Sequence, residues 1–406
     1  MKAKIVIGGN YGDEGKGLAT DFFSSFGHTL NVLFNGGAQR GHTVDKRHGK
    51  KVVHHVFHHF GSGVLNDRTS LTFFDENFML CPNVFMQEYR ELQSLGVSLD
   101  NVAAKDCRIT TPYDAFINQI VESKRDGARH GSCGFGIWET QKRYEARPKE
   151  PRFGQVYDMV RNNDYDGIWN WLKDIAENYL PKRLKEYDID ISEVSPEYLE
   201  LINSEGLRLH FYEDIKDMCR IIGCVTDFKS FYKRWETCYD TVVFEGGQGL
   251  ALDENNKAGM PHLTASNTTS EIPLRRLQEV GCEDVEVCYV TRSYFTRHGA
   301  GPLPSECARE EINAAIEDNT NVFNDYQHGI RYGKFKSWEF VERVAQDRNR
   351  AQHIIPTAKF SMLMTHLNYT NGDVCGDTRL NILGGWFDKY YTSDSKFAEE
   401  IKTFSN

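Results

Sequence analysis

The stretch KIVIGGNYGDEGKGLATD, residues 4–21, decides the fold, because a short apolar run ends in a glycine-rich turn that opens into a helix. Lys4 to Ile7 has the character of a buried parallel strand. The turn and the start of the helix contain Gly8, Gly9, Gly12, Gly15 and Gly17. Glycines let backbone N–H groups approach an anion without interference from Cβ atoms. The stretch therefore predicts a strand, a phosphate-binding loop and a helix, in that order.

This loop departs from a standard P-loop. Lys16 is in place, but Gly17 stands where the magnesium-binding Ser or Thr belongs, and Asn10 replaces the first glycine. Asp13 and Glu14 add two carboxylates, whose negative charge is not expected in a loop that binds only phosphate. The loop therefore suits a site that also holds a cation or takes a proton. The alternative interpretation is a tight turn whose acids face solvent.

Composition narrows the class of protein. The 406 residues are 40% hydrophobic, which is enough to bury a full core. The net charge of −10 disfavours a nucleic-acid polymer as partner, although small anions can bind in local basic pockets. Ten cysteines include no CxxC pair, which argues against a zinc site and for reduced thiols. With no apolar span and no signal-peptide pattern, the chain is expected to have no membrane partner and to be cytoplasmic.

Further strands end in glycine-rich or polar turns. These strands are predicted at 29–34, 240–245, 285–291 and 360–368, the last of which is the final strand. The first is followed by NGGAQRGHTV and the second by GGQGLALDENN. Because parallel strands end at one edge of a sheet, Asp13 and His42 are expected to face one ligand. The pattern predicts an α/β fold with a large mixed, mostly parallel central sheet flanked by helices, and P-loop-like glycine loops at one edge.

The chain is expected to form a single domain over residues 1–406. A mostly helical insertion is predicted at about 157–230, where GIWNWLKDIAENYLPKRLKEY has an amphipathic pattern. Another amphipathic helix is predicted after Phe85, ending at Gly96.

Other segments carry possible chemistry. His54, His55, His58 and His59 lie in a run rich in valine and phenylalanine, which favours a strand over a metal-binding helix. The polar segment from Gly127 to Arg152 holds four arginines and two lysines, so it is a candidate anion-binding loop, with a solvated basic surface as the alternative. Arg292 and Arg297 suggest a loop that grips a carboxylate, and a turn at 324–333 precedes a helix.

Five motifs resemble, in order and spacing, those of the adenylosuccinate synthetase family. They are GDEGKG at 12–17, NGGAQRGHTV at 35–44, FEGGQGLALD at 244–253, TASNTT at 264–269 and TRHGAGPLPSE at 296–306. The resemblance covers residues 1–375. It implies a ligase that joins L-aspartate to the 6-oxo carbon of a purine nucleoside monophosphate through a 6-phosphoryl intermediate, driven by ATP or GTP with Mg²⁺.

The resemblance also implies catalytic roles. Asp13 resembles the base that removes the purine N1 proton, and it resembles a magnesium ligand together with the Gly41 carbonyl. His42 looks like the group that polarises the transferring phosphoryl, and Gln248 would hydrogen-bond the purine edge. The residues implied to bind the triphosphate are Gly12, Glu14, Gly15, Lys16, Gly17, Gly41, Thr43 and Asn368.

Two further sets of residues follow from the resemblance. The residues implied to bind the purine monophosphate are Gln39, Ser132, Cys133, Arg147, Gln248 and Thr264. The aspartate loop would consist of Thr296, Arg297, Gly299 and Gly301, with Arg297 clamping the carboxylate. Because Arg147 looks like the arginine that reaches a neighbouring subunit's active site, a homodimer with shared sites is implied.

Departures from the family bear on specificity. The usual signature that recognises the guanine of GTP ends in Thr-Lys-Leu-Asp, whereas residues 365–368 read Thr-His-Leu-Asn. The Asn368 amide offers one acceptor and one donor, a pattern that adenine satisfies and guanine N1–H and N2–H do not. The chain also stops soon after Gly384 and Gly385, without the Gly-Pro-x-Arg segment that closes the base pocket. Cys133 and Gln39 replace the usual Thr and Asn.

Three functional interpretations stay open. HVFHHFGSG and NDYQHGIRYG resemble the archaeal and phage branches, whose phage members include 2-aminoadenylosuccinate synthetases that use dGMP and ATP. We therefore favour (d)GMP, L-aspartate and ATP as substrates. Synthesis of adenylosuccinate from IMP, aspartate and GTP is the alternative, because the better-known phage enzymes have lost the acid at the position of Asp13. A non-catalytic purine-nucleotide sensor is the weakest reading, since a sensor has no reason to keep these catalytic groups.

Overall fold

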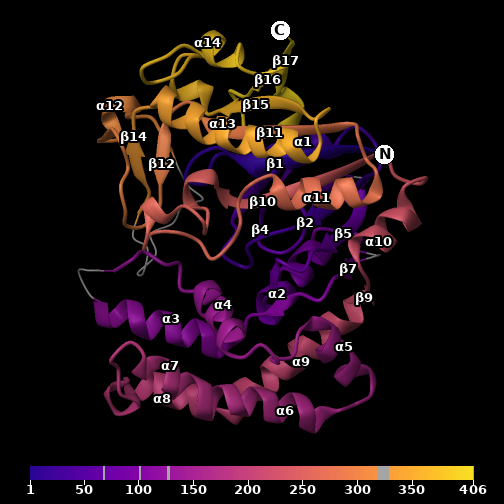
Figure 1. Ribbon diagram of the computed structural model, residues 1–406, viewed down its shortest axis with the longest axis vertical. Helices are drawn as coiled ribbons and strands as arrows, with labels where there is room; N and C mark the ends of the chain where they lie inside the picture. The colour runs from indigo at the N-terminus through magenta and orange to yellow at the C-terminus, as the bar shows by residue number, and fades with distance from the viewer. Residues whose placement is uncertain (67–68, 100–101, 126–128, 318–328, 406) are drawn as a thin grey trace.

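The computed structural model describes residues 1–66, 69–99, 102–125, 129–317 and 329–405. In these residues a ten-stranded sheet has the order β17-β16-β15-β11-β1-β10-β2-β5-β7-β9, and only β16 and β17 pair antiparallel (Figure 1). The strands are β1 Lys2–Gly8, β2 Thr29–Leu33, β5 Thr69–Phe74, β7 Val102–Ala104, β9 Ile222–Val225, β10 Thr241–Gly249, β11 Val285–Arg292, β15 Lys359–Thr365, β16 Lys389–Thr392 and β17 Lys402–Ser405. The predicted α/β fold with a mostly parallel sheet is confirmed.

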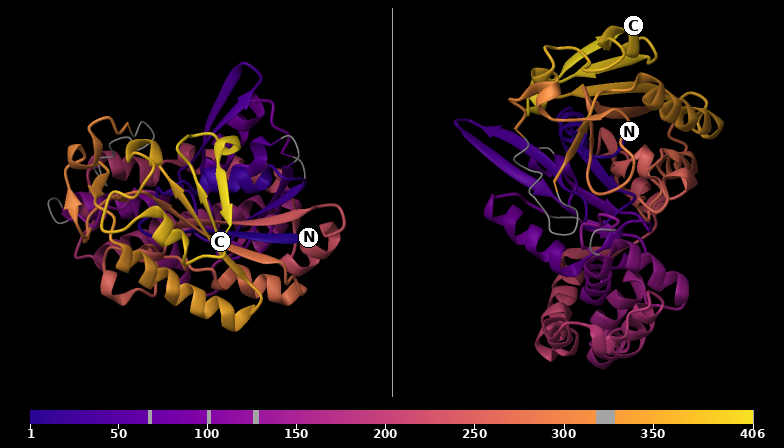
Figure 2. Two further views of the ribbon diagram at one scale, coloured as in Figure 1. Left: turned by 90° about the horizontal axis from the view of Figure 1, so that it is seen from above. Right: turned by 90° about the vertical axis from the view of Figure 1, so that its left-hand side faces the viewer.

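Strand β1 shows why the sheet is buried on both faces. Ile5 and Ile7 belong to one hydrophobic cluster and Val6 to another, as the two-residue period of a strand requires. All three side chains are fully buried. Helix α1, Lys16–Ser24, contributes to the cluster of Val6. Helices α10 Phe228–Trp235, α11 Glu271–Val280 and α13 Ser337–Ile354 contribute to the other cluster, so helices flank both faces (Figure 2).

A lobe of helices lies beside the sheet, at the bottom of Figure 1. Its helices are α2 Pro82–Ser94, α3 Pro112–Arg125, α4 Ile137–Ala146, α5 Phe153–Arg161, α6 Tyr165–Asp174, α7 Leu180–Lys185, α8 Pro196–Asn203 and α9 Glu205–Ile221, with a π-helical turn at Ile175–Tyr179. Helices α5 to α9 fall in the stretch predicted to be a helical insertion. That stretch also contains β9, an edge strand of the main sheet.

Small sheets and short helices complete the described residues. Strands β3 His42–His48 and β4 Lys51–Phe57 form a hairpin; β6 Met79–Leu80 pairs with β8 Arg108–Ile109; and β12 Phe295–Arg297, β13 Glu306–Cys307 and β14 Arg331–Gly333 form a third small sheet. Helices α12 and α14 span Glu310–Asn313 and Leu380–Gly384. Short 3-10 helices lie at Ser62–Leu65, Ile191–Glu193, Leu250–Leu252, Lys257–Gly259, Leu367–Tyr369 and Ala398–Glu400. None of the described helices combines the length and the apolar character needed to cross a membrane.

The structure tests the local predictions. His54 and His55 lie on β4, so the strand interpretation is confirmed for the first half of the histidine run, whereas His58 and His59 follow the end of the strand at Phe57. Helix α2 begins at Pro82, before Phe85, because proline is favoured in the first turn. The prediction that the strand at 360–368 is the last was wrong, since β16 and β17 follow it. Part of the turn predicted at 324–333 lies outside the described residues, and its end forms β14.

The segment from Gly127 to Arg152 is not the polar loop that its composition suggests. Residues 127 and 128 lie outside the described residues, and α4 occupies the middle of the segment. Arg143 on α4 is fully buried, with its guanidinium 2.9 Å from Asp114 and 2.6 Å from Glu150. This arginine therefore holds the lobe together and is not open to an anion.

Candidate active site

Five adjacent strands, β15, β11, β1, β10 and β2, send their C-terminal turns to one edge of the sheet. The turns touch. A Cβ added at Gly17 would lie 2.9 Å from the Thr43 carbonyl oxygen, and one added at Gly249 would lie 2.3 Å from the Asn10 carbonyl oxygen. The first two glycine turns therefore meet, as the sequence predicts, and the turn after β10 closes against the first.

Asn10 explains why the first loop lacks its leading glycine. Its side-chain amide donates to the Thr291 hydroxyl at 2.8 Å and accepts from the Arg343 guanidinium at 2.6 Å. Arg343 also donates to the Gly9 carbonyl at 3.3 Å. These bonds tie the loop to β11 and α13, so it is held in place before any ligand arrives.

Glu14 is buried inside the loop. The backbone N–H of Asn10 donates to its carboxylate, and Lys16 Nζ lies 4.0 Å from Oε2. Within the described residues Oε2 has no hydrogen-bond partner. Burial raises the pKa of Glu14 to about 7, although the charge of Lys16 opposes this shift. The loop thus holds a buried acid whose second oxygen lies against Gly8 and near Lys16 without a hydrogen bond from the part of the chain that the structure describes.

Asp13 stands in the left-handed region at φ 54, with its side chain 28% exposed. Arg292 Nε donates to its carbonyl oxygen, and His298 Nε2 lies 2.9 Å from Oδ2. Burial by itself raises the pKa of Asp13, but the hydrogen bond and charge of His298, with the charges of Arg292 and Lys16, hold that pKa well below its usual range. Asp13 is therefore an ionised carboxylate in a strained position at the mouth of the loop.

His42 begins β3 and is buried against Glu245 of β10. Its Nδ1 lies 2.5 Å from Glu245 Oε1. Burial alone would raise the pKa of Glu245, but the charge of Arg40 and the hydrogen bonds from His42 and Ser62 lower it to about 2. Burial lowers the pKa of His42 to about 4, although the bond to Glu245 raises it. An ionised carboxylate only accepts, so neutral His42 carries its proton on Nδ1 and has Nε2 available for a ligand.

Glu245 is a site residue that the sequence reasoning missed. It is completely buried and accepts from the backbone N–H of Ser62 at 2.9 Å and from the Ser62 hydroxyl, while Arg40 lies 3.8 Å away. A signal was present, because an acid at the end of the apolar run DTVVFE requires a buried partner.

Gln248 and Gln39 bring two side-chain amides to the same edge. Gln248 has φ 63 at the end of β10, and its Oε1 lies 3.8 Å from where a Cβ on Gly12 would stand. Both amide atoms of Gln39 are buried without a hydrogen-bond partner among the described residues. Because buried amides normally find partners, Gln39 has the character of a group that binds a ligand.

The other predicted purine residues lie on two separate loops. Ser132 donates to Asn118 at 2.7 Å, and burial raises the pKa of the neighbouring Cys133 thiol. A Cβ on Gly131 would lie 2.5 Å from Cα of Gly299, so this loop packs against the predicted aspartate loop. Thr264 is half-buried.

The predicted aspartate loop starts on β12. Among the described residues, Thr296 Oγ1 and Arg297 Nε are buried without hydrogen-bond partners. The two terminal nitrogens of Arg297 donate to the carbonyls of Pro302, at 2.7 Å, and His262, at 3.1 Å. Gly301, at φ 102, leaves no room for a Cβ, which would lie 2.4 Å from Arg297 Nη2. Each terminal nitrogen carries two N–H groups, so the Arg297 guanidinium keeps donors for a carboxylate while it holds these carbonyls.

The turn after β15 joins the site through Thr365. Its hydroxyl donates to the Glu14 carbonyl at 2.8 Å, and a Cβ on Gly15 would lie 3.0 Å from its methyl group. The ring of His366 stacks on that of Tyr369, with centroids 6.3 Å apart and an interplanar angle of 29°. Asn368, in the same turn, is exposed. The predicted base-reading residue thus stands on a turn anchored to the phosphate loop.

Arg147 is engaged elsewhere in this chain. It follows α4, lies 2.6 Å from Asp174 of α6 and covers the Tyr179 ring at 5.0 Å. Its guanidinium is bound to the helical lobe, and a role in a neighbouring subunit's site stays a prediction.

The donors fit a magnesium ion of the kind that bridges phosphates. Mg²⁺ commonly takes one or two protein oxygens and completes its shell with phosphate oxygens and water. Asp13 offers an ionised, partly exposed carboxylate, and Gly41 is exposed immediately before β3. No group of three His, Cys, Asp or Glu side chains suited to a metal occurs in the described ranges. The ion would accordingly depend on the nucleotide for most of its ligands.

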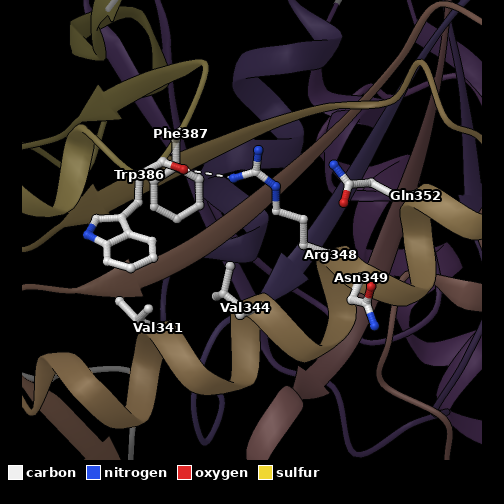
Figure 3. Close-up of a pocket in the computed structure, with 8 residues that line it drawn as sticks. Val341, Val344, Arg348, Asn349, Gln352, Trp386 and Phe387 are labelled. Carbon is white, nitrogen blue, oxygen red and sulfur yellow. Dashed lines mark hydrogen bonds between the residues drawn. The ribbon is translucent and has the colours of Figure 1, made fainter.

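A pocket of about 150 Å³ lies away from these groups, between α13 and the segment after α14 (Figure 3). Arg348 crosses it and donates to the Trp386 carbonyl at 2.8 Å, with Val341, Val344 and Phe387 around it. Its lining contains neither a carboxylate nor a histidine, so it offers no acid or base for catalysis.

Comparison with known proteins agrees with this geometry. The family model described as adenylosuccinate synthetase matches residues 5–334. The adenylosuccinate synthetase of Methylococcus capsulatus is 28% identical over 310 residues, which are 74% of this chain and 64% of that protein. That of Trichodesmium erythraeum is 29% identical over 326 residues, 80% of this chain and 68% of the relative. The chain thus spans a little under two thirds of the length of the Methylococcus relative.

Two solved structures share the fold. Fully ligated adenylosuccinate synthetase from Plasmodium falciparum has a TM-score of 0.65 at 18% identity and covers 100% of this chain and 88% of that one. Succinoaminodeoxyadenylate synthetase of cyanophage S-2L, bound to dGMP and dATP, has a TM-score of 0.59 at 12% identity and covers 99% and 95%. At these identities the two structures establish the fold and leave the substrate open.

Proposed function

Because this chain belongs to the adenylosuccinate synthetase family, we propose that it is a carbon–nitrogen ligase that condenses L-aspartate with the 6-oxo group of a purine nucleoside monophosphate. The meeting of Asp13, Lys16 and the His42–Glu245 pair at one sheet edge carries this proposal. These groups are suited to removing a proton and stabilising a phosphoryl group in transfer. A sensor would need only the binding groups.

The proposed reaction has two steps. The 6-oxo group is a poor leaving group, so Asp13 takes the N1 proton while O6 attacks the γ-phosphorus of the triphosphate, and the bond to the departing nucleoside diphosphate breaks. Lys16 and His42 stabilise the charge on the phosphoryl oxygens. The amine of aspartate then displaces phosphate from C6. A Mg²⁺ ion held by Asp13 and the Gly41 carbonyl would neutralise charge on the phosphates.

We propose (d)GMP as the acceptor and ATP as the donor. Asn368 supports ATP, since its amide matches the donor and acceptor of adenine. The cyanophage protein with the same fold is described with dGMP and dATP. IMP with GTP is the second candidate, supported by the retained Asp13 and by relatives named adenylosuccinate synthetase. A cytoplasmic homodimer completes the proposal, and Arg147 would have to leave Asp174 to reach a second subunit.

The test is a set of reactions catalysed by the purified protein. IMP, GMP and dGMP are each supplied with aspartate, Mg²⁺ and either ATP or GTP, and phosphate release and the succinylated product are measured. Condensation of GMP or dGMP with ATP supports the leading proposal, whereas condensation of IMP with GTP supports the alternative. Absence of product from every combination would refute the ligase function.

Asn368→Asp tests how the protein recognises the purine base of the nucleoside triphosphate. The new carboxylate accepts from guanine N1–H and N2–H but faces the adenine N1 lone pair, so preference should move toward GTP. Because Asn368 is exposed without nucleotide, we expect a change of about 1.5–2 kcal/mol, on the order of 10- to 30-fold in the ratio of kcat/KM for the two donors. Asn371→Asp, three residues along and also exposed, is the matched control. A wild-type enzyme that uses GTP at least about tenfold better than ATP contradicts this reading of Asn368.

Arg297→Leu tests the aspartate loop. The variant should raise the KM for aspartate on the order of 10², with much less effect on the purine nucleotide, since truncating one partner of a buried ion pair costs about 2–4 kcal/mol. Initial rates across an aspartate titration measure this change. Arg379→Leu, whose side chain is 73% exposed, controls for loss of positive charge. Equal losses for both substrates would assign Arg297 to loop stability instead.

A further inference from the structure

The contact between Asp13 and His298 joins two loops that lie far apart in sequence. Asp13 belongs to the phosphate loop, and His298 directly follows Arg297 in the predicted aspartate loop. Their side chains meet at 2.9 Å between His298 Nε2 and Asp13 Oδ2, both partly shielded, at 18% and 28% exposure. Asp13, the acid proposed to accept the proton, is thus held by a residue of the loop proposed to bind aspartate.

Both ends of this contact are anchored. On one side, Arg292 Nε donates to the Asp13 carbonyl, which fixes the backbone beneath the carboxylate. On the other side, Arg331 donates to the carbonyls of Gly299, at 3.0 Å, and Gly301, at 2.8 Å. The flanking backbone is held at both ends, so the bond from His298 selects the direction of the Asp13 side chain.

We propose that His298 is a positioning residue for Asp13. The N–H of His298 donates to one oxygen of the Asp13 carboxylate and orients that carboxylate. Because an ionised carboxylate has about four lone-pair sites, Asp13 can still accept a proton or bind a cation. Metal-binding carboxylates are usually held by such outer hydrogen bonds, and losing one typically costs 10- to 100-fold in metal affinity or activity.

The same contact joins the loops proposed to bind the two substrates. Arg297 and His298 are adjacent, so the residue proposed to hold aspartate and the residue that orients Asp13 share one stretch of backbone. This inference rests on the proposed function for the identity of the substrates, but the histidine–carboxylate contact can be tested by metal binding alone.

The experiment compares His298→Leu, which removes the donor, with His298→Gln, whose side-chain N–H can replace it. Mn²⁺ binding is measured by electron paramagnetic resonance in the presence of an unreactive ATP analogue, and kcat and KM are measured with the active purine. We expect His298→Leu to weaken Mn²⁺ binding about 10- to 100-fold and to lower kcat more than it raises the KM for the purine. His298→Gln should stay within about threefold of wild type.

His54→Leu is the matched control, because His54 pairs with Asp45 at 3.1 Å on the exposed face of the hairpin, outside the site. It should bind Mn²⁺ as wild type does. Wild-type Mn²⁺ affinity in His298→Leu would overturn the proposal, as would equal damage in His298→Gln and His298→Leu, which would mean that the ring acts by packing. Since Mn²⁺ binding needs no turnover, a wild-type protein that binds Mn²⁺ but condenses no purine refutes the proposed function separately.

Discussion

Asp13→Asn is expected to lower kcat by on the order of 10²–10⁴, because it removes the only negative charge that the proposed mechanism uses to accept the N1 proton. Asparagine is the informative substitution here. Asp13 has φ 54, a conformation that asparagine adopts readily, whereas alanine would add backbone strain. The amide oxygen can still accept from His298, so the loop keeps its shape while the charge is lost.

Steady-state rates and nucleotide binding separate the two effects. Without metal, the variant should bind the triphosphate within a few-fold of wild type, and it should melt at a similar temperature, while product formation nearly stops. Asp21→Asn is not a suitable control, since Asp21 is buried and bonded to Lys46 and Asn66. Asp166→Asn, in the first turn of α6, is better placed. Activity of Asp13→Asn within about tenfold of wild type would remove this acid from the mechanism.

The depressed pKa of Asp13 limits how it can act. A carboxylate paired with His298 is a weak base, whereas the purine N1–H is a weak acid, so a complete proton transfer before any other step would be strongly uphill. Transfer becomes favourable if O6 attacks the phosphorus as the proton leaves, because the oxyanion is consumed as it forms. We therefore propose that Asp13, Lys16 and His42 act in a coupled proton and phosphoryl transfer.

Most of the fold could be predicted because its signals are local. Each central strand is a short apolar run that ends in glycine or a polar turn, and such runs predict parallel strands without knowledge of their partners. Strand β9 lacks this signal. It is a four-residue edge strand between two helices, with only Ile222 buried, and it exists because β7 offers an unpaired edge. Strands β16 and β17 likewise extend an existing sheet, after a segment whose regular structure is limited to a 3-10 turn and the short helix α14.

Composition gave a misleading prediction for a segment in which a charged side chain is buried. The segment before Arg152 is rich in basic residues and glycine, which is typical of an anion-binding loop. The structure places Arg143 on α4 against Asp114 of α3 and Glu150, contacts between positions 29 and 7 residues apart. Nothing in a local window distinguishes a buried paired arginine from an exposed one, so the helix and its ion pairs required tertiary information.

The site likewise contains residues that the local sequence predicts and residues that it does not. Asp13, Lys16 and His42 stand next to glycines in motifs, so their presence at a site could be predicted from type and spacing. Glu245 and His298 contact another side chain of the site, and such partners are defined by distance in space. Glu245 lies 203 residues from His42, and only the parallel register of β10 with β2 brings them together.

His42→Asn should lower kcat by on the order of 10² or more while leaving the KM values nearly unchanged, since the imidazole is proposed to act only as charge develops on the phosphoryl group. Its pKa of about 4 makes it neutral at pH 7 in the free protein, with the proton on the nitrogen facing Glu245. The negative charge of a bound phosphoryl group raises that pKa and favours the doubly protonated ring. A change confined to KM would make His42 a binding residue.

Glu245→Gln decides whether the carboxylate works through His42. The amide can still accept from Nδ1 but loses the charge that stabilises a protonated ring, so kcat should fall by on the order of tenfold. If Glu245 acts only through His42, the double variant with His42→Asn should be no slower than His42→Asn alone, because the route by which the carboxylate acts is already gone. Ser62→Ala, which removes one hydroxyl donor to Glu245, keeps the charge and should leave kcat within about threefold. Additive losses in the double variant would mean that Glu245, beside the buried Arg40, supports the fold independently of the histidine.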